Sequence, residues 1–183
     1  WIWGNGWLAQ LGLIDFAGGL VVHTSSGIAA LVGAIVVGPR KGFPRAPFMP
    51  HNLTRTATGA GILWVGWHGF SAGSALMANG SAGMAMLATH LCASAASLTW
   101  VFLDWIRFRK SSALGALTGM ISGLGAIAAG AGFVSPLSAM IIGVVTGFAC
   151  FYSIHFIKHV LEIDDALDVF PIHGVSGIIG SLL

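Results

Sequence analysis

The chain contains long stretches without a single charged residue, and this feature limits its fold more than any other. No Asp, Glu, Lys or Arg occurs from Phe16 to Pro39, from Thr56 to Leu103, or from Ser111 to Ile157. Hydrophobic residues make up 56% of the 183 positions and charged residues only 8%, whereas soluble domains carry about 25% charged residues. Most of the surface must therefore face something other than water. We expect an all-α, polytopic bundle of transmembrane helices.

Six segments are long and apolar enough to be candidate membrane crossings, each of which requires roughly 20 mostly apolar residues. They are expected near residues 16–38, 57–78, 82–103, 113–133, 137–157 and 169–183, the last one truncated. Residues 1–14 are expected to form the end of an earlier helix and an interfacial loop rich in Trp. Because the chain begins and ends within apolar sequence, we interpret residues 1–183 as a single transmembrane domain fragment of a longer protein.

The basic residues are distributed asymmetrically among the loops. With six crossings, every Lys and Arg falls on one side of the membrane, and the positive-inside rule makes that side cytoplasmic. The N-terminus of the fragment is then outside, and the protein is expected in the cell membrane. The basic residues are Arg40, Lys41, Arg45, Arg55, Arg107, Arg109, Lys110 and Lys158.

Glycine recurs at intervals of four residues in two of the expected helices. Small residues at this spacing allow helix backbones to approach closely in lipid, so we interpret the pattern as helix packing. Two cysteines lie among apolar neighbours and are expected to be small buried residues without a disulfide or metal role. The glycines are Gly115, Gly119, Gly123, Gly143 and Gly147, and the cysteines are Cys92 and Cys150.

An internal repeat, H-x-x-S-G-I, begins at His23 and again at His173. The first copy lies on a crossing directed inward and the second on a crossing directed outward, which predicts an inverted pseudo-symmetric repeat. Such repeats place a substrate site near the middle of the bilayer. An Asp precedes each copy: Asp15 lies eight residues before His23, and Asp168 lies five residues before His173. Since ionisable residues within membrane spans are usually functional, the two histidines are the leading site candidates.

Several linked motifs resemble those of the ammonium transporter (Amt) family, in the same order and over essentially the whole chain. The Asp15–His23 segment reads DFAGGxVVH, in the form of the Amt branch rather than the Rhesus branch. The other motifs are Pro50–Leu53 (PHNL), Gly66–Ser74 (GWxGFxAGS) and Asp164–Gly174 (DDxxDVFxxHG). The resemblance implies that the chain corresponds to spans five to ten of a protein with about eleven.

The same resemblance implies roles for particular residues in a pore. His23 and His173 correspond to a hydrogen-bonded histidine pair in a narrow hydrophobic pore, and Phe70 to one of two stacked gating phenylalanines. Imidazole can donate and accept hydrogen bonds and relay protons near neutral pH, so a pair of rings could carry ammonia, a proton or both. We expect the two rings to contact each other at the pore centre.

Trp3 and Ser74 correspond to the outer site that recruits ammonium, which Asp15 supports from beneath. An aromatic face attracts a small cation by about 0.5–2 kcal/mol. Trp67, Phe70 and Ser74 lie at positions i, i+3 and i+7, so they are expected to share one helix face, with Trp67 lining the pore. Trp3 as an interfacial anchor, Phe70 as core packing and Ser74 as a packing residue remain alternatives. Asp15 is expected to cap a helix that begins at Phe16.

Two positions depart from the family pattern. Position 68 is His where an aromatic residue is usual, and position 71 is Ser where Asn is usual. His68 lies about 100° around the helix from Trp67, so it is expected to face a neighbouring subunit or span. His90 and His155 are expected to be structural imidazoles that bond to a neighbouring helix.

The leading function is ammonium or ammonia transport, with a homotrimer, membrane lipid and a PII-type nitrogen regulator as implied partners. The regulator would dock on the basic 39–56 loop. An ammonium sensor of the same fold is the alternative. A haem-binding electron carrier is a third possibility, because paired histidines can ligate iron. The absence of H-E-x-x-H argues against a metalloprotease. We expect no enzyme activity, catalytic residues, metal, cofactor or nucleic-acid partner.

Overall fold

The computed structural model describes residues 1–46 and 48–183, which form helices, turns and loops without a strand. Three π-helical segments extend the α-helices: η1 (Gly19–Thr24) leads into α2, η2 (Phe156–Val160) continues α6, and η3 (Phe170–Val175) leads into α7. The α-helices are α1 (Trp7–Gln10), α2 (Ser25–Val37), α3 (Leu53–Gly73), α4 (Gly80–Phe108), α5 (Ala113–Ile127), α6 (Pro136–His155) and α7 (Ser176–Leu182). The expected all-α bundle is confirmed.

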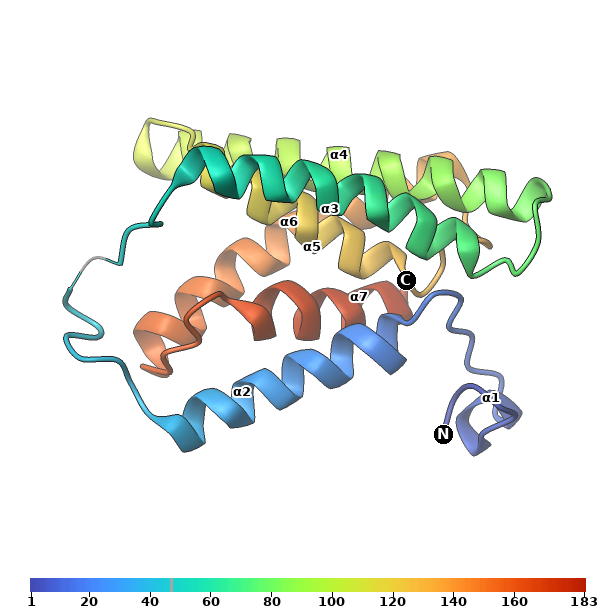
Figure 1. Ribbon diagram of the computed structural model, residues 1–183, viewed down its shortest axis with the longest axis horizontal. Coiled ribbons are helices and arrows are strands. Elements are labelled where there is room, and N and C mark those ends of the chain that lie inside the picture. The colour runs from blue at the N-terminus through green and yellow to red at the C-terminus, as the bar shows by residue number, and fades with distance from the viewer. Residues whose placement is uncertain (47) are drawn as a thin grey trace.

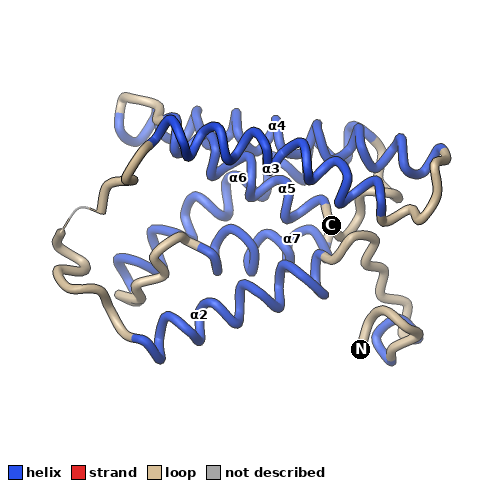
Figure 2. Tube along the Cα trace, in the orientation of Figure 1, coloured by secondary structure: helices blue, strands red, loops and turns tan. Residues whose placement is uncertain are grey.

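The helices form an elongated bundle in which α4 packs against both α5 and α6. Helices α3 and α4 run together along one side, and α2 and α7 lie along the opposite side (Figure 1). Helices α5 and α6 lie between them, and the N-terminal segment with α1 extends from one end of the bundle (Figure 2). Two segments far apart in sequence, η1 with α2 and η3 with α7, therefore lie against each other.

Glycines let α5 and α6 pack closely against α4. A Cβ atom at Gly119 would lie 2.6 Å from the Trp100 Cβ and 2.8 Å from the Ala96 carbonyl oxygen. On α6, a Cβ at Gly147 would lie 2.9 Å from the same Ala96 carbonyl oxygen. These separations are shorter than the 3.5–4.0 Å or so at which carbon atoms normally pack, so only glycine allows the observed approach. The interpretation of the glycine pattern as helix packing is confirmed.

Side-chain caps determine where two of the long helices begin. The Asn52 side chain accepts a hydrogen bond from the Arg55 amide at 2.9 Å, and α3 begins at Leu53. The Asn79 side chain accepts from the Ala82 amide at 3.0 Å, and α4 begins at Gly80. Both helices therefore start before the ranges expected from hydropathy, because polar first turns are helical when capped. Helix α3 also ends at Gly73, five residues before the predicted limit of 78.

Helix α5 ends at Ile127, six residues before the predicted limit of 133, and a turn follows it. This turn supports the start of the first repeat. The carbonyl groups of Ala129 and Ala128 accept hydrogen bonds from the amides of Phe16 and Ala17, at 2.8 and 2.7 Å. Unwinding the last turn of α5 thus releases backbone acceptors that fix the segment leading into η1.

The outer surface of the bundle is strongly apolar. Among the described residues, three continuous helices are long and apolar enough to cross a membrane, namely Gly19–Val37, Gly80–Phe108 and Pro136–Val160. Helix α2 has a single buried residue, Gly27, and exposes large side chains such as Val37, which is 86% exposed. Apolar surface of this extent is suited to hydrocarbon or to other membrane-embedded segments. The protein is a multi-pass membrane protein, and the six individual crossings stay a prediction.

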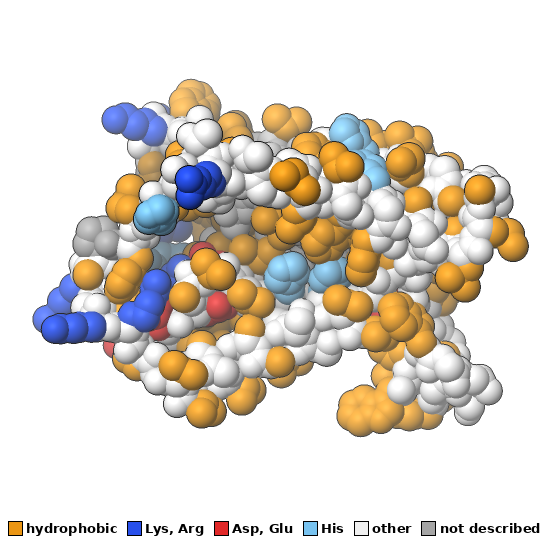
Figure 3. All heavy atoms as spheres, in the orientation of Figure 1, with side chains coloured by type: hydrophobic (Ala, Val, Ile, Leu, Met, Phe, Trp, Pro, Cys, Tyr) orange, Lys and Arg blue, Asp and Glu red, His pale blue; other side chains and the backbone are white. Residues whose placement is uncertain are grey.

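One ion pair connects two loops at one end of the bundle, and a second joins η2 to the loop that follows it. The Asp164 carboxylate, which is buried, accepts hydrogen bonds from the Arg40 Nη2, Nε and backbone amide at 2.6, 2.8 and 2.8 Å. The Arg40 guanidinium lowers the pKa of Asp164 below its ordinary value. Lys158 and Asp168 form a second pair at 2.7 Å. On the face shown in Figure 3, Lys and Arg side chains gather at this end of the molecule.

Candidate functional site

His23 and His173 meet where the two repeats cross. Their Nδ1 atoms lie 3.2 Å apart, and their rings are nearly parallel, with an interplanar angle of 15°. His23 lies in η1 and is 3% exposed, while His173 lies in η3 and is half-buried. Histidine side chains are visible in the hollow between the two sides of the bundle (Figure 3). The distance is within the range expected for a hydrogen-bonded pair, and the role of the pair in conduction stays a prediction.

The pair leaves one imidazole nitrogen of His23 free. A hydrogen bond between the two Nδ1 atoms requires one ring to donate and the other to accept, so only one proton lies between them. His23 Nε2 is buried and has no hydrogen-bond partner among the described residues. Because an unpaired buried polar atom costs about 1–3 kcal/mol, this nitrogen is suited to bind a small polar molecule.

The serine of each repeat makes the same contact in both copies. Ser26 Oγ donates to the His23 carbonyl at 3.1 Å, and Ser176 Oγ donates to the His173 carbonyl at 3.3 Å. Both histidines also lie in π-helical turns, in which the His23 amide donates to the Gly18 carbonyl five residues earlier. Such turns occur frequently at functional sites, and here they place the two imidazoles in equivalent positions.

The glycine of each repeat lies against the other copy. A Cβ at Gly27 would overlap the backbone of Gly174, the residue after His173. A Cβ at Gly177 would overlap Gly19 and Thr24, the second of which follows His23. These reciprocal contacts follow from a pseudo-twofold arrangement of the two copies, and they bring the helix backbones close enough for the imidazoles to meet.

Trp67 on α3 stacks over the histidine pair. Its ring centroid lies 5.0 Å from that of His23, at an interplanar angle of 13°, and 6.4 Å from that of His173, at 8°. The Phe70 ring centroid lies 5.9 Å from that of His23. Helix α3 therefore presents an aromatic face to the two imidazoles.

Three of the sequence-derived candidates, Trp3, Phe70 and Ser74, line one pocket next to the pair. This pocket has a volume of about 480 Å³, and its lining includes Trp3, Phe16, Phe70 and Ser74. Trp3 Nε1 donates to the Asp15 carbonyl oxygen at 2.8 Å, which fixes the position of an indole that is 50% exposed. The Ser74 hydroxyl donates to the Phe70 carbonyl at 3.0 Å, so its oxygen can still accept a hydrogen bond from a ligand.

The buried Asp15 carboxylate organises the backbone under this pocket. Its two oxygens accept hydrogen bonds from four successive amides, those of Gly18, Gly19, Leu20 and Val21, at 2.7–3.0 Å. The expectation that a helix begins at Phe16 is wrong, because the Phe16 amide bonds to the turn after α5 and the helix begins at Gly19. Gly18 has a φ of 111°, a left-handed conformation that favours glycine.

Asp165 is the structural counterpart of Asp15, although it was not among the predicted site residues. Asp165 Oδ2 accepts from the Phe170 amide at 2.7 Å, as Asp15 Oδ2 accepts from the Leu20 amide, five residues later in both copies. Asp165 also precedes His173 by eight residues, the same spacing that separates Asp15 from His23. The equal spacing between each Asp and its histidine could therefore have identified Asp165 from the sequence. Asp168, five residues before His173, instead pairs with Lys158.

The other histidines lie outside this site. His155 Nδ1 lies 3.3 Å from Arg107 Nη2 on the neighbouring helix α4. His90 stacks on Trp64, with ring centroids 5.1 Å apart, and has no hydrogen bond among the described residues. His68 lies next to His90, with centroids 5.6 Å apart, and does not line the pocket next to the histidine pair. Within residues 1–46 and 48–183, no group of three His, Cys, Asp or Glu side chains could hold a metal ion.

An apolar helical bundle with a polar pair at the crossing of two inverted repeats has the architecture of membrane proteins built from inverted repeats, a class that includes many transporters. Comparison with known proteins identifies the group within this class. The model of the Ammonium Transporter Family matches residues 1–183. The chain is 46% identical to ammonium transporters of Aquifex aeolicus and Bacillus subtilis, covering 100% of this chain and 43% and 45% of theirs. The chain belongs to the ammonium transporter family.

Solved structures agree with this assignment. The crystal structure of Saccharomyces cerevisiae Mep2 is 43% identical, with a TM-score of 0.90 over 98% of this chain and 41% of that chain. A structure described as a sensor Amt protein is 37% identical, with a TM-score of 0.93 over 100% of this chain and 48% of that chain. The chain thus spans less than half the length of the relatives that it matches.

Proposed function

We propose that the protein carrying this chain transports ammonium, using a twin-histidine pore centre formed by His23 and His173. The observation that carries the proposal is the 3.2 Å contact between the two Nδ1 atoms, beside a pocket lined by Trp3, Phe70 and Ser74. The similar proteins from Aquifex aeolicus and Bacillus subtilis are described as ammonium transporters. The site therefore offers a recruitment pocket, then an aromatic constriction, then a polar relay, one after another along the proposed pore.

Recruitment takes place at the outer pocket. The Trp3 indole face attracts the ammonium cation by about 0.5–2 kcal/mol, and the Ser74 oxygen accepts one of its N–H groups. The bond from Trp3 Nε1 to the Asp15 carbonyl holds the indole at the pocket. Asp15 acts as a positioning residue, because its carboxylate is occupied by four backbone amides rather than directed at the ligand.

Conduction past Phe70 requires loss of the charge. A cation near the bilayer centre costs at least about 2.5–3.5 kcal/mol, whereas neutral ammonia avoids this cost. Ammonia that reaches the pair is suited to bond with the free His23 Nε2, which has no other partner among the described residues. The proton shared between the two rings supplies a route by which charge can follow the nitrogen.

The test is electrical transport by the complete protein in proteoliposomes. Replacement of His23 or His173 by Ala should abolish or alter the ammonium-dependent current, while the protein still inserts and assembles. Replacement of His155, which lies at the end of α6 away from the pair, is the matched control and should leave the current near the wild-type value. Unchanged current in both pore variants would contradict the proposed role. Wild-type protein that binds ammonium without any flux would favour the ammonium-sensor function.

The orientation proposed from charge places the N-terminus outside and the basic loops in the cytoplasm, supported by the gathering of basic side chains at one end (Figure 3). Single cysteines at Arg45, Arg109, Asn79 and Ser135, in a protein lacking its native cysteines, test it by sided labelling. Labelling of the positions of Asn79 and Arg109 from the same side would contradict it.

The complete protein is proposed to assemble as a homotrimer in lipid, with a PII-type regulator at the cytoplasmic loops. The apolar exposed surface of α2 supports contact with lipid or further membrane segments. Mass measurement of the purified protein tests the trimer. Retention of a purified PII protein, and loss of retention when the basic residues of the 39–56 loop are replaced, tests the regulator.

A further inference from the structure

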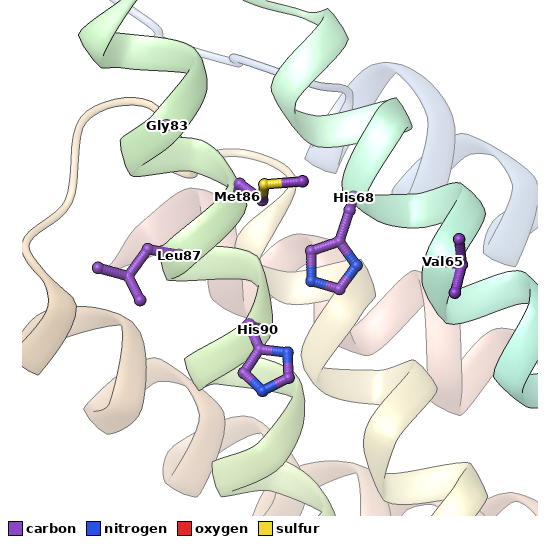
Figure 4. Close-up of a pocket in the computed structure, with 6 residues that line it drawn as sticks. All are labelled: Val65, His68, Gly83, Met86, Leu87 and His90. Atoms are coloured by element: carbon purple, nitrogen blue, oxygen red, sulfur yellow. The ribbon is translucent and has the colours of Figure 1, made fainter.

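A second histidine cluster lies between α3 and α4, outside the proposed pore. His68 and His90 line a pocket of about 570 Å³ together with Val65, Gly83, Met86 and Leu87. Figure 4 shows that the two imidazoles approach each other across this pocket, one from each helix, with Met86 on the same side of α4. Neither histidine contributes to the transport mechanism proposed above. We propose that His68, His90 and Met86 bind one monovalent copper ion.

The hydrogen bond of His68 prepares this ring to act as a metal ligand. His68 Nδ1 lies 2.8 Å from the Trp64 carbonyl oxygen, which can only accept, so Nδ1 carries the proton. Nε2 is then the unprotonated nitrogen with a free lone pair. Metal-binding histidines nearly always donate their other ring N–H to a carbonyl or carboxylate in this way, which fixes both tautomer and orientation.

The neighbouring indole holds the second imidazole. The Trp64 and His90 rings stack with centroids 5.1 Å apart and an interplanar angle of 13°, and neither His90 nitrogen has a hydrogen bond among the described residues. The same tryptophan therefore orients His68 through its carbonyl and His90 through its ring. One residue on α3 therefore contacts both imidazoles and leaves His68 Nε2 and both His90 nitrogens without a hydrogen bond among the described residues.

The separation of the rings agrees with a shared metal ion. The centroids of His68 and His90 are 5.6 Å apart. Two metal–nitrogen bonds of about 2 Å each, with ring radii of about 1 Å, give centroid separations of about 6 Å or somewhat less when the bonds are bent. Met86 and His90 are four residues apart on α4, so both side chains project from the same face of that helix.

The chemistry of the pocket selects monovalent copper. Imidazole binds several transition metals, but a thioether ligand favours Cu(I). The pocket residues include no Asp or Glu, and apart from the two imidazoles they are apolar or glycine. A divalent ion would retain two positive charges, because no carboxylate among these residues neutralises them. A soft ion with a single charge needs less compensation.

The experiment uses the complete protein, purified in detergent and stripped of metal with a chelator. It is titrated anaerobically with Cu(I) in competition with bicinchoninate, whose coloured Cu(I) complex measures the copper that the protein does not hold. We expect one Cu(I) per chain, and at least a tenfold loss of affinity in His68→Phe and His90→Phe. Met86→Leu should weaken Cu(I) binding and leave Zn²⁺ binding unchanged. Met84→Leu, on the same helix but outside the pocket, is the matched control and should bind as the wild type does.

X-ray absorption of the loaded protein should show two nitrogen ligands at about 2.0 Å and one sulfur ligand at about 2.3 Å. Bound Cu(I) should also raise the melting temperature of the wild type but not that of the His68→Phe variant, whose fold is checked by size-exclusion chromatography.

Equal Cu(I) affinity in the wild type and both histidine variants would overturn the site. Equal affinity in Met86→Leu, or a shell without sulfur, would overturn the choice of ligands and metal. Because Met86→Leu preserves volume and polarity, that result does not depend on tolerance of the histidine replacements.

Discussion

Replacing Gly27 by Ala tests whether the crossing of the two repeats is what brings the histidines together. Gly27 lies one helical turn after His23, and a Cβ there would overlap backbone atoms of Gly174, the residue after His173. Backbone atoms cannot rotate away as a side chain can. The substitution must therefore push η3 and α2 apart at the point that positions both imidazoles.

The size of the effect follows from the contact distances. Carbon atoms pack at about 3.5–4.0 Å, so relief of the overlap requires a separation of about 1 Å or more. The Nδ1 atoms are now 3.2 Å apart, and an increase of that size breaks their hydrogen bond. Overpacking costs about 1–3 kcal/mol, and the lost hydrogen bond costs about 0.5–1.5 kcal/mol. We expect a clear loss of thermal stability and a larger proportional loss of ammonium current per folded molecule.

Gly33→Ala provides the matched control, because Gly33 lies on the same helix and a Cβ there would meet no described atom within 4 Å. Ala is favoured over Gly in helix interiors by about 0.5–1 kcal/mol, so this variant should be as stable as the wild type or more so. Thermal unfolding in detergent and current in proteoliposomes are measured for both variants. If Gly27→Ala has the stability and current of Gly33→Ala, the crossing does not position the pair and the reasoning fails.

Four further predictions concern the Arg40–Asp164 pair, the second repeat and the gate. Arg40→Ala should destabilise the protein by about 1–3 kcal/mol in chemical unfolding, because the buried Asp164 carboxylate loses its guanidinium partner and keeps only the backbone amide of residue 40; a double-mutant cycle with Asp164→Asn isolates the pair. Because the pKa of Asp164 is lowered, its stabilisation is present at neutral pH and should disappear only as the pH falls below about 3.9 through that lowered pKa. Asp165→Asn should reduce current more than folded yield, since the carboxylate caps the turn that carries His173. Phe70→Ala should leave ammonium binding intact and change conduction; lower stability with unchanged flux per folded molecule would show that Phe70 only packs the core.

The general course of the chain could be predicted from hydropathy, but helix ends could not. Hydropathy does not register a cap, so the polar turns after Asn52 and Asn79 were expected to lie outside their helices. It also favoured a helix through residues 128–133, where the apolar composition continues. There the backbone carbonyls are needed by Phe16 and Ala17, and this tertiary requirement ends the helix.

The candidate site was predicted where a motif occurs twice and was missed where the comparison was incomplete. The two H-x-x-S-G-I copies, together with the resemblance to the ammonium transporter family, selected His23 and His173, because equivalent residues in an inverted repeat occupy equivalent depths. Asp15 was matched with Asp168 because Asp168 is the acidic residue nearest to the second motif. The number of residues between each Asp and its histidine was not compared. A carboxylate that caps one copy must lie at the same sequence distance in the other, since the backbone between cap and histidine has the same geometry. That criterion selects Asp165.

No sequence pattern could predict which buried polar atoms lack a hydrogen-bond partner, and the proposed function depends on two such atoms. His23 Nε2 and Trp67 Nε1 are buried ring nitrogens without a hydrogen-bond partner among the described residues, and the two rings stack on each other. An isolated unpaired group of this kind is a cost to folding. Two of them at the crossing of the repeats, beside a pocket that contains an aromatic face and a hydroxyl oxygen, instead support the proposed passage for a small molecule that both donates and accepts hydrogen bonds. Ammonia has both properties and carries no charge to be removed from water, so it meets the requirements of the site without a resident counter-ion.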